Sequence, residues 1–308
     1  MKILASRRFP GPAWEELRDV EYLAGLLPEG AGGRREDVEA LAVVGEPVED
    51  ETLDLFPNLR VVANYGAGYD SIDVRACAVR GIAVTNTPGV LTATTADLTF
   101  ALLLAVRRRV VVGDRAVREG RWRGGWADPD FLGHDVSGST LGIVGFGRIG
   151  QAVAHRAAAF GMRVLQNSRR RDGEGWRELD ELLAEADAVS LHVPLTSETR
   201  GLLDASRLTL LRDGACLVNT ARGQIVDEDA LVRELVSGRI EAGLDVFAHE
   251  PTVPRELLRL SNVVLTPHVG SATTETREAM TRVLVDNLLA AGRGERPPNL
   301  VYPATEAP

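Results

Sequence analysis

Short apolar runs alternate with helix-like segments through the first third of the chain. The runs predict strands at Lys2–Ala5, Ala40–Val44, Leu59–Ala63 and Ile82–Thr85. Helix signals occur at Pro12–Asp19 and at Ile72–Arg80, the second of which is closed by Gly81. Because alternating strands and helices are typical of a parallel sheet, this region is predicted to form a first, smaller βα domain.

Helical periodicity then runs from Thr92 to Glu119, much farther than in an average helix. We therefore expect one helix over this range, long enough to bridge two domains. The next segment, Gly120–Asp135, is irregular and polar and contains Trp122 and Trp126. It is predicted to be a loop.

Six further apolar runs follow, mostly separated by helical stretches. These predicted strands are Leu141–Val144, Arg163–Gln166, Ala188–His192, Ala215–Asn219, Ile240–Leu244 and Val263–Thr266. A last helix is predicted at Thr276–Ala291, and the Pro-rich tail Arg296–Pro308 has no core pattern. Six parallel strands indicate a doubly wound sheet, in which ligands bind at the carboxyl ends of the strands.

The first of these six strands leads into a glycine-rich turn that opens a helix. Gly145, Gly147 and Gly150 have the G-x-G-x-x-G spacing of dinucleotide-binding proteins. The first glycine permits the tight turn, the second lets the backbone approach a pyrophosphate, and the third lets helix and strand pack closely. The alternative is an ordinary glycine-rich turn between a strand and a helix.

The end of the next strand bears on which dinucleotide is bound. An NAD site has an acidic residue there, which accepts hydrogen bonds from the ribose 2′-hydroxyl. This chain has Ser168, Arg169, Arg170 and Arg171 instead. Guanidinium groups suit a 2′-phosphate, so the turn favours NADP(H). The alternative is a solvated basic turn.

Three residues from different strand ends suit the reduction of a carbonyl group. Arg222 can bind a carboxylate and polarise the neighbouring carbonyl, and His268 can give its proton to the oxygen as hydride reaches the carbon. Glu250 can orient the imidazole and favour its charged form. Singly, each has an ordinary interpretation: a surface arginine, a helix cap and a strand-end histidine.

Composition limits the class of protein. The chain has 308 residues, 44% of them hydrophobic, and a net charge of −9, which argues against nucleic acid or an anionic membrane as the main partner. Cys77 and Cys216 form no disulfide framework and suit a reducing cytosol. With no signal peptide and no apolar run long enough to cross a membrane, we expect a cytoplasmic protein.

No metal site is expected. His249 adjoins Glu250, but neither H-x-x-x-H nor H-E-x-x-H occurs. His134, His155 and His192 are interpreted as structural, although His192 begins the turn beside the expected cofactor.

Taken together, these segments resemble the D-isomer-specific 2-hydroxyacid dehydrogenases over nearly the whole chain. The matching segments are Gly145–Gly150, Leu191–Thr199, Asn219–Gly223, Asp245–Pro251 and Thr266–Gly270. The resemblance implies that Arg222 binds the 2-oxo acid, that His268 is the acid/base and that Glu250 pairs with it.

The stretch around Thr92, the Trp-containing loop and the Ser168–Arg169 pair resemble the glyoxylate and hydroxypyruvate reductase branch. The resemblance further implies that the backbone of Ala67 and Gly68 holds the substrate carboxylate. Valine usually stands where Ala67 does, so the pocket is expected to be looser. A homodimer is also implied, with the region after Thr92 at its interface.

The motif, the strand ends and the resemblance together predict a set of residues that contact the cofactor. They are Thr95, Gly145, Gly147, Arg148, Ile149, Gly150, Ser168, Arg169, Arg170, His192, Val193, Pro194, Thr199, Thr220, Ala221, Asp245, His268 and Gly270.

The predicted fold is α/β, with two Rossmann-like βα domains and the active site in the cleft between them. The substrate domain is expected at residues 1–93, completed by 272–308, and the dinucleotide-binding domain at 94–271. The predicted function is NAD(P)H-dependent reduction of glyoxylate or hydroxypyruvate to the D-2-hydroxy acid, with NADP(H) preferred and NAD(H) as the alternative cofactor.

Other functions remain open at this point. A reductase of a larger sugar acid such as 2-ketogluconate would differ in the loop Trp122–Leu132. Phosphite dehydrogenase is another alternative, whereas formate enzymes of this fold tend to lack the glutamate that Glu250 matches. A dinucleotide-sensing corepressor is the non-enzymatic alternative, and the chain has no long recruitment tail of the kind such a protein would use.

Overall fold

The computed structural model describes residues 1–124 and 129–301, which form two compact units. The first unit is Met1–Leu91 with Ser271–Pro308, and the second is Thr92–Gly270. Each is described by itself. Trp126, predicted to lie in a loop, is outside the described residues.

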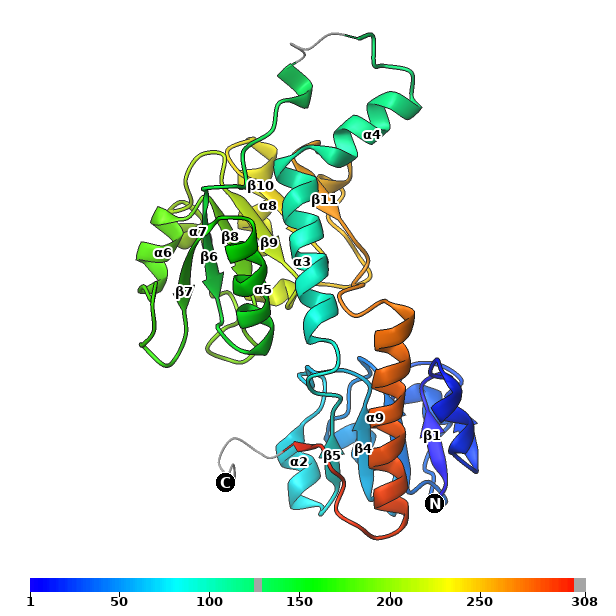
Figure 1. The fold of residues 1–308 in the computed structure, drawn as a ribbon. Coiled ribbons are helices and arrows are strands. Elements are labelled where there is room, and N and C mark those ends of the chain that lie inside the picture. The colour runs from blue at the N-terminus through cyan, green and yellow to red at the C-terminus, as the bar shows by residue number, and fades with distance from the viewer. Residues whose placement is uncertain (125–128, 302–308) are drawn as a thin grey trace. The chain divides into compact units, whose positions relative to one another are not determined.

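The first unit contains a six-stranded sheet in the order β12-β5-β4-β3-β1-β2 (Figure 1). All neighbouring strands are parallel except β12, which is antiparallel to β5. The strands are β1 (Ile3–Ala5), β2 (Val20–Tyr22), β3 (Ala40–Val43), β4 (Val61–Asn64), β5 (Ala83–Thr85) and β12 (Leu300–Val301).

Two strands of this sheet were not expected, and both are at its edges. β2 is only partly buried, so it lacks a clear apolar pattern. β12 has two half-buried residues and lies in the Pro-rich tail, where the sequence has no core pattern. Pairing with β5, rather than burial of an apolar run, adds this part of the tail to the sheet.

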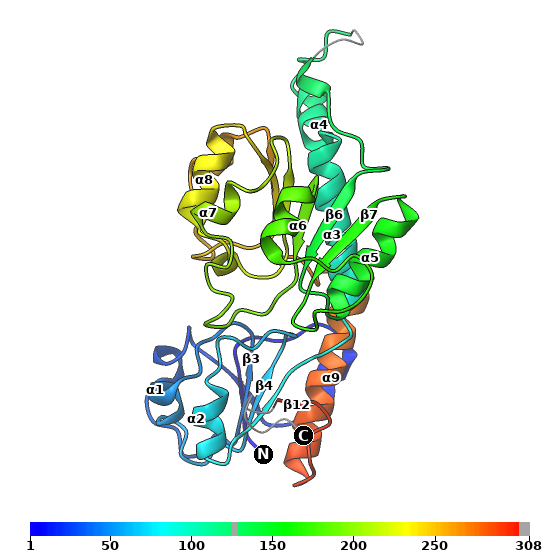
Figure 2. The same cartoon turned by 90° about the vertical axis from the view of Figure 1, so that its left-hand side faces the viewer.

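Helices cover both faces of this sheet. In Figure 2, α1 (Asp50–Leu53) and α2 (Val74–Val79) lie on one side and α9 (Thr274–Gly292) on the other. α9 contacts β4 and the 3-10 helix Pro12–Glu16, which was predicted as an α-helix. Two further short elements are the 3-10 helices Glu29–Ala31 in this unit and Pro129–Phe131 in the other.

The second unit contains an all-parallel sheet in the order β11-β10-β9-β8-β6-β7. A single parallel bridge between Gln166 and Trp176 extends it beyond β7. With this bridge in the place of a third strand, the order from the bridge to β10 matches the 3-2-1-4-5-6 order of dinucleotide-binding sheets, and β11 adds one strand beyond it. The strands are β6 (Thr140–Val144), β7 (Arg163–Asn167), β8 (Ala188–Leu191), β9 (Cys216–Asn219), β10 (Glu241–Leu244) and β11 (Val263–Leu265).

Helices and apolar clusters cover both faces of this second sheet as well. The elements are α5 (Arg148–Ala159), α6 (Leu179–Glu185), α7 (Ala205–Leu208), α8 (Glu228–Val236), and the 3-10 helices Gly223–Ile225 and Leu257–Arg259. The predicted α/β fold class with two Rossmann-like units is confirmed. In the part of the chain that the structure describes, no helix is both long and apolar enough to cross a membrane.

The single long helix predicted over Thr92–Glu119 is wrong. The structure has α3 (Thr92–Arg107) and α4 (Val110–Arg118), separated at Arg109, whose φ of 52° is left-handed. The carbonyl of Arg107 accepts a hydrogen bond from the backbone N–H of His134 at 2.7 Å. The Arg109 guanidinium donates to the carbonyl of Asp130 at 2.6 Å. These contacts with a distant loop break the helix, and periodicity along the sequence does not reveal them.

Candidate active site

The turn after β6 depends on two glycines for its shape. Gly145 has a φ of 97°, and a Cβ there would lie 2.6 Å from the carbonyl carbon of His192. A Cβ on Gly150 would lie 2.2 Å from the carbonyl oxygen of Gly145. Only glycine fits at either position, so these residues fix the turn between β6 and α5.

Gly147 differs from its two neighbours in the motif. Its φ is −80°, which any residue can adopt, and a Cβ there would meet nothing within 4 Å. It is also the N-cap of α5, and its missing side chain leaves the first helical N–H groups without a side-chain acceptor. Open space before uncapped N–H groups fits a pyrophosphate. Arg148, exposed, and Ile149, half-buried, begin the helix beside it.

Two cationic side chains at the end of β7 have no anionic partner in the described part of the chain. Arg171 forms an ion pair with Glu178 at 3.3 Å, whereas Arg169 and Arg170 are exposed and have no ion pair with any described residue. The hydroxyl of Ser168 donates to the carbonyl of Arg170 at 3.3 Å. The two guanidinium groups are therefore available to an anion.

Hydrogen bonds and close packing hold the segment 168–177, which carries these arginines, against β7. The buried side chain of Gln166 donates to the carbonyl of Asp172 at 2.8 Å, and the Trp176 indole donates to the carbonyl of Ser168 at 3.4 Å. A Cβ on Gly175 would lie 2.4 Å from the carbonyl oxygen of Val164. These contacts were not predicted from the sequence, although Gly175 directly before Trp176 was a signal that could have revealed them.

The residues after β8 form a closed turn. The Thr199 hydroxyl donates to the carbonyl of Pro194 at 2.6 Å, so this predicted cofactor residue holds the turn itself. His192 is at the start of the turn, and its Nε2 atom lies 2.6 Å from the hydroxyl oxygen of Ser190. Burial lowers the pKa of His192 to about 3, so this imidazole is neutral at physiological pH. Between these two contacts, Val193 is half-buried and Pro194 is exposed.

The end of β9 presents Thr220, Ala221 and Arg222. The Thr220 hydroxyl lies 3.0 Å from that of Thr99, which donates to the carbonyl of Thr95 on α3. The side chain of Asn219 donates to the carbonyl of Arg222 at 2.9 Å and accepts from the N–H of Ala221 at 3.0 Å. The backbone that carries the Arg222 guanidinium is thereby fixed.

Gly223 lets this loop approach the loop after β10. A Cβ on Gly223 would lie 2.0 Å from the carbonyl carbon of Phe247. The side chain of Gln224 also donates to the carbonyl of Ala248 at 2.8 Å. The packing of the two loops brings Arg222 close enough for its charge to act on Glu250. This role of Gly223 was not predicted from the sequence, although its place directly after Arg222 was a signal.

Asp245 organises the turn between β11 and the end of the unit. It is fully buried, and its carboxylate accepts from the Thr266 hydroxyl at 2.6 Å and from the N–H groups of Val269 and Gly270 at 2.8 Å. Its carbonyl accepts from the N–H of His268. Burial raises the pKa of Asp245. This predicted cofactor residue thus also shapes the backbone around His268.

His268 and Glu250 are in direct contact. Nδ1 of His268 lies 2.7 Å from the Glu250 carboxylate, whose other oxygen accepts from the N–H of Phe247 at 3.1 Å. Burial raises the pKa of Glu250, but the bond to His268, the Phe247 N–H and the charge of Arg222 outweigh it and lower that pKa overall. The φ of His268 is 54°, a strained value often found at active sites. Half of the imidazole is exposed, with 49% of its surface accessible.

Ala67 and Gly68 are in the first unit, in the loop that follows β4. Ala67 is half-buried and Gly68 is exposed. Among described residues, neither backbone N–H has a hydrogen-bond acceptor. Both groups are available to an anion.

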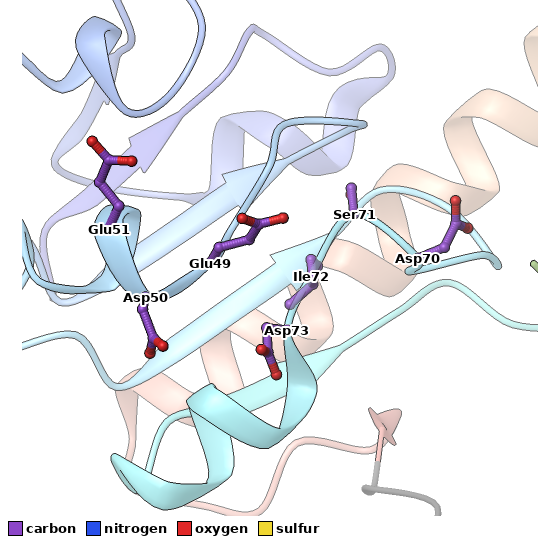
Figure 3. A pocket seen from close by; sticks show the side chains of 7 residues that line it. All are labelled: Glu49, Asp50, Glu51, Asp70, Ser71, Ile72 and Asp73. Carbon is purple, nitrogen blue, oxygen red and sulfur yellow. The ribbon is translucent and has the colours of Figure 1, made fainter. Parts of the chain in front are cut away.

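The same unit carries a shallow hollow of about 530 Å³. Figure 3 shows acidic side chains around it, and its lining is Glu49, Asp50, Glu51, Asp70, Ser71, Ile72 and Asp73. Carboxylates of this density repel an anionic 2-oxo acid, so the hollow does not suit such a substrate. The described residues contain no group of three His, Cys, Asp or Glu side chains that could hold a metal ion.

Residues 100–270 match the model of the "D-isomer specific 2-hydroxyacid dehydrogenase, NAD binding domain". A glyoxylate reductase from Thermococcus litoralis is 50% identical over 277 residues, which cover 86% of this chain and 84% of the relative. The chain belongs to the D-isomer specific 2-hydroxyacid dehydrogenase family. The predictions of this family and of an NAD(P)-dependent enzyme are therefore confirmed.

Solved structures agree with this assignment. A protein from Thermus thermophilus superimposes with a TM-score of 0.90 at 46% identity, covering 98% of this chain and all of the other. The NADPH-dependent glyoxylate/hydroxypyruvate reductase from Sinorhizobium meliloti, in complex with NADP and malonate, superimposes with a TM-score of 0.85 at 36% identity. The match covers 97% of this chain and 96% of the other. The family explains why polar groups converge at the carboxyl ends of the second sheet.

Proposed function

We propose that this dehydrogenase reduces glyoxylate and hydroxypyruvate to the D-2-hydroxy acids and prefers NADPH. The observation that carries the proposal is the His268–Glu250 contact of 2.7 Å, with the charge of Arg222 acting on the same carboxylate. The names of the relatives from Thermococcus litoralis and Sinorhizobium meliloti support the substrate class.

Each of the three residues has a separate task in the proposed reaction. The Arg222 guanidinium binds the substrate carboxylate and polarises the adjacent carbonyl group. Glu250 holds Nδ1 of His268, which leaves Nε2 to donate a proton to the carbonyl oxygen. The nicotinamide of the bound cofactor supplies the hydride. The negative charge of Glu250 stabilises the imidazolium that donates the proton.

The preference for NADPH rests on the end of β7. Arg169 and Arg170 are exposed and have no ion pair with a described residue, and the Ser168 hydroxyl lies beside them. No acidic side chain stands at Ser168–Arg171, where an NAD site would hold the ribose 2′-hydroxyl. A 2′-phosphate would bind both guanidinium groups without first breaking an existing ion pair.

A homodimer is part of the proposal. Exposed apolar side chains gather on α4 and the segment after it: Val110 is 55% exposed, Val117 60%, Trp122 61% and Leu132 67%. Apolar surface of this kind is typical of an interface between protein chains. A reducing compartment such as the cytoplasm accords with the two free, buried cysteines Cys77 and Cys216.

His268→Ala tests the proposed chemistry. We expect kcat for glyoxylate reduction with NADPH to fall by about two powers of ten or more, because the general acid is lost. NADPH affinity, measured by fluorescence titration, should stay within about threefold, because the cofactor contacts proposed at Gly147 and Ser168–Arg170 are intact. Turnover near that of the wild type would contradict the assignment of His268.

A further inference from the structure

Three consecutive carbonyl groups in the loop after β4 are bound by asparagine side chains. The side chain of Asn64 donates to the carbonyls of Gly66 at 3.1 Å and Gly68 at 2.7 Å. The side chain of Asn86 donates to the carbonyl of Ala67 at 2.8 Å. The backbone N–H of Thr87 also donates to the carbonyl of Gly66, at 2.9 Å. The two side chains, with this backbone bond, fix the direction of the carbonyl groups of this loop.

This arrangement also fixes the direction of the backbone N–H groups. In a planar trans peptide, the carbonyl of one residue and the N–H of the next point in opposite directions. The carbonyls of Gly66 and Ala67 face the asparagines, so the N–H groups of Ala67 and Gly68 point away from them. Neither N–H has an acceptor among the described residues. Successive unpaired N–H groups of this kind form an anion-binding concavity.

Both asparagines are held firmly. Asn64 ends β4 and is only 3% exposed. The backbone N–H of Asn86 donates to the carbonyl of Asn299 at 3.2 Å, and its carbonyl accepts from the buried Asn287 on α9 at 3.4 Å. The fully buried Asn287 also accepts from the N–H of Asn299 at 3.0 Å. α9 and the segment before β12 therefore support the Asn86 side of the loop.

We propose that Asn64 and Asn86 are positioning residues for substrate binding. They turn the carbonyl dipoles of Gly66–Gly68 away from the substrate carboxylate and present the Ala67 and Gly68 N–H groups to it. Without them, partly negative carbonyl oxygens could rotate toward the anion and repel it. This inference rests on the proposed function and on the role that the family resemblance implies for the Ala67 and Gly68 backbone, which is to bind the carboxylate of the 2-oxo acid together with Arg222.

Asn86→Leu, which removes the donor but keeps a similar side-chain volume, tests the inference. We expect the KM for glyoxylate and the inhibition constant of oxalate, an unreactive dicarboxylate, each to rise about tenfold, as for the loss of one hydrogen bond in a site. The KM for NADPH should not change. A merely structural role of Asn86 would not raise the KM for glyoxylate and the inhibition constant of oxalate while leaving the KM for NADPH unchanged.

Asn58→Leu is the matched control. Asn58 is in the same unit, and its side chain also donates to a backbone carbonyl, that of Glu36, at 2.7 Å, but it lies outside the loop. Unchanged constants in Asn86→Leu, or equal rises in both variants, would overturn the inference. If Asn86→Leu does not fold, Asn86→Ser, whose shorter side chain cannot reach Ala67, is judged by the same constants. Failure of the wild type to reduce glyoxylate would instead overturn the proposed function.

Discussion

At the scale of single residues, the candidate site depends on charges that sit close together on different loops. Glu250 contacts His268 directly, and the positive charge of Arg222 also lowers the pKa of the Glu250 carboxyl group. The hydrogen bond from His268 helps to hold the pKa of Glu250 below its ordinary value despite burial. Glu250 is therefore ionised throughout the neutral range and can stabilise a protonated imidazole.

Glu250→Gln should test this electrostatic role. The amide still accepts from Nδ1 of His268 but carries no charge, so we expect kcat to fall by up to about a hundredfold. Steady-state rates with glyoxylate and NADPH at neutral pH check this, and turnover equal to that of the wild type would refute the role of Glu250.

Sequence position identified the three polar side chains but not the residues that place them. Arg222, Glu250 and His268 follow predicted strands, and the carboxyl ends of parallel strands meet at one edge of a sheet. Gly223 was missed because its role arises from close approach to distant backbone at Phe247. Asn64 was missed because its bond to the carbonyl of Gly68 depends on how the loop after β4 folds back. A single sequence does not show such contacts.

At the scale of elements, two glycines in the turn between β6 and α5 have different roles. One is needed for folding, and the other is proposed to be needed for binding the cofactor. Gly145 has a left-handed φ and no room for a Cβ, whereas Gly147 has an ordinary φ and open space before it. The first glycine is required by the fold. The second is not required by the fold, and the open space before it suits the cofactor phosphates that we propose to bind there.

A matched pair of substitutions should reveal this difference. Gly145→Ala should lower the free energy of unfolding by about 2 kcal/mol or more, because it adds strain and a clash with His192. Gly147→Ala should change that free energy by less than about 0.5 kcal/mol but raise the KM for NADPH at least about tenfold. Urea denaturation and steady-state kinetics measure the two effects. Equal loss of stability in both variants would contradict this division.

Local pattern predicted most elements, and the failures have a common cause. Of the twelve strands in residues 1–124 and 129–301, ten were anticipated because their buried apolar runs are visible in the sequence. The edge strands β2 and β12 bury too little apolar surface to leave a pattern. The break at Arg109 was missed because it depends on hydrogen bonds to residues 130–134, which no periodicity encodes.

At the scale of the whole molecule, the proposal assigns roles to residues of each unit. The glycine turn, the arginines after β7 and the His268–Glu250 pair belong to the second unit, and the Ala67–Gly68 loop belongs to the first. The family assignment covers both, since relatives align over 86% of the chain or more. The central claim is therefore that this enzyme reduces glyoxylate and prefers NADPH as the cofactor.

The most direct test is the initial rate of glyoxylate reduction by the wild-type enzyme with NADPH and with NADH. We expect kcat/KM to be at least about tenfold higher for NADPH, since the Arg169 and Arg170 guanidinium groups can bind its 2′-phosphate. Arg169→Ala combined with Arg170→Ala should abolish this preference and leave the rate with NADH nearly unchanged. Equal or faster reduction with NADH by the wild type, or no reduction of glyoxylate with either cofactor, would contradict the account.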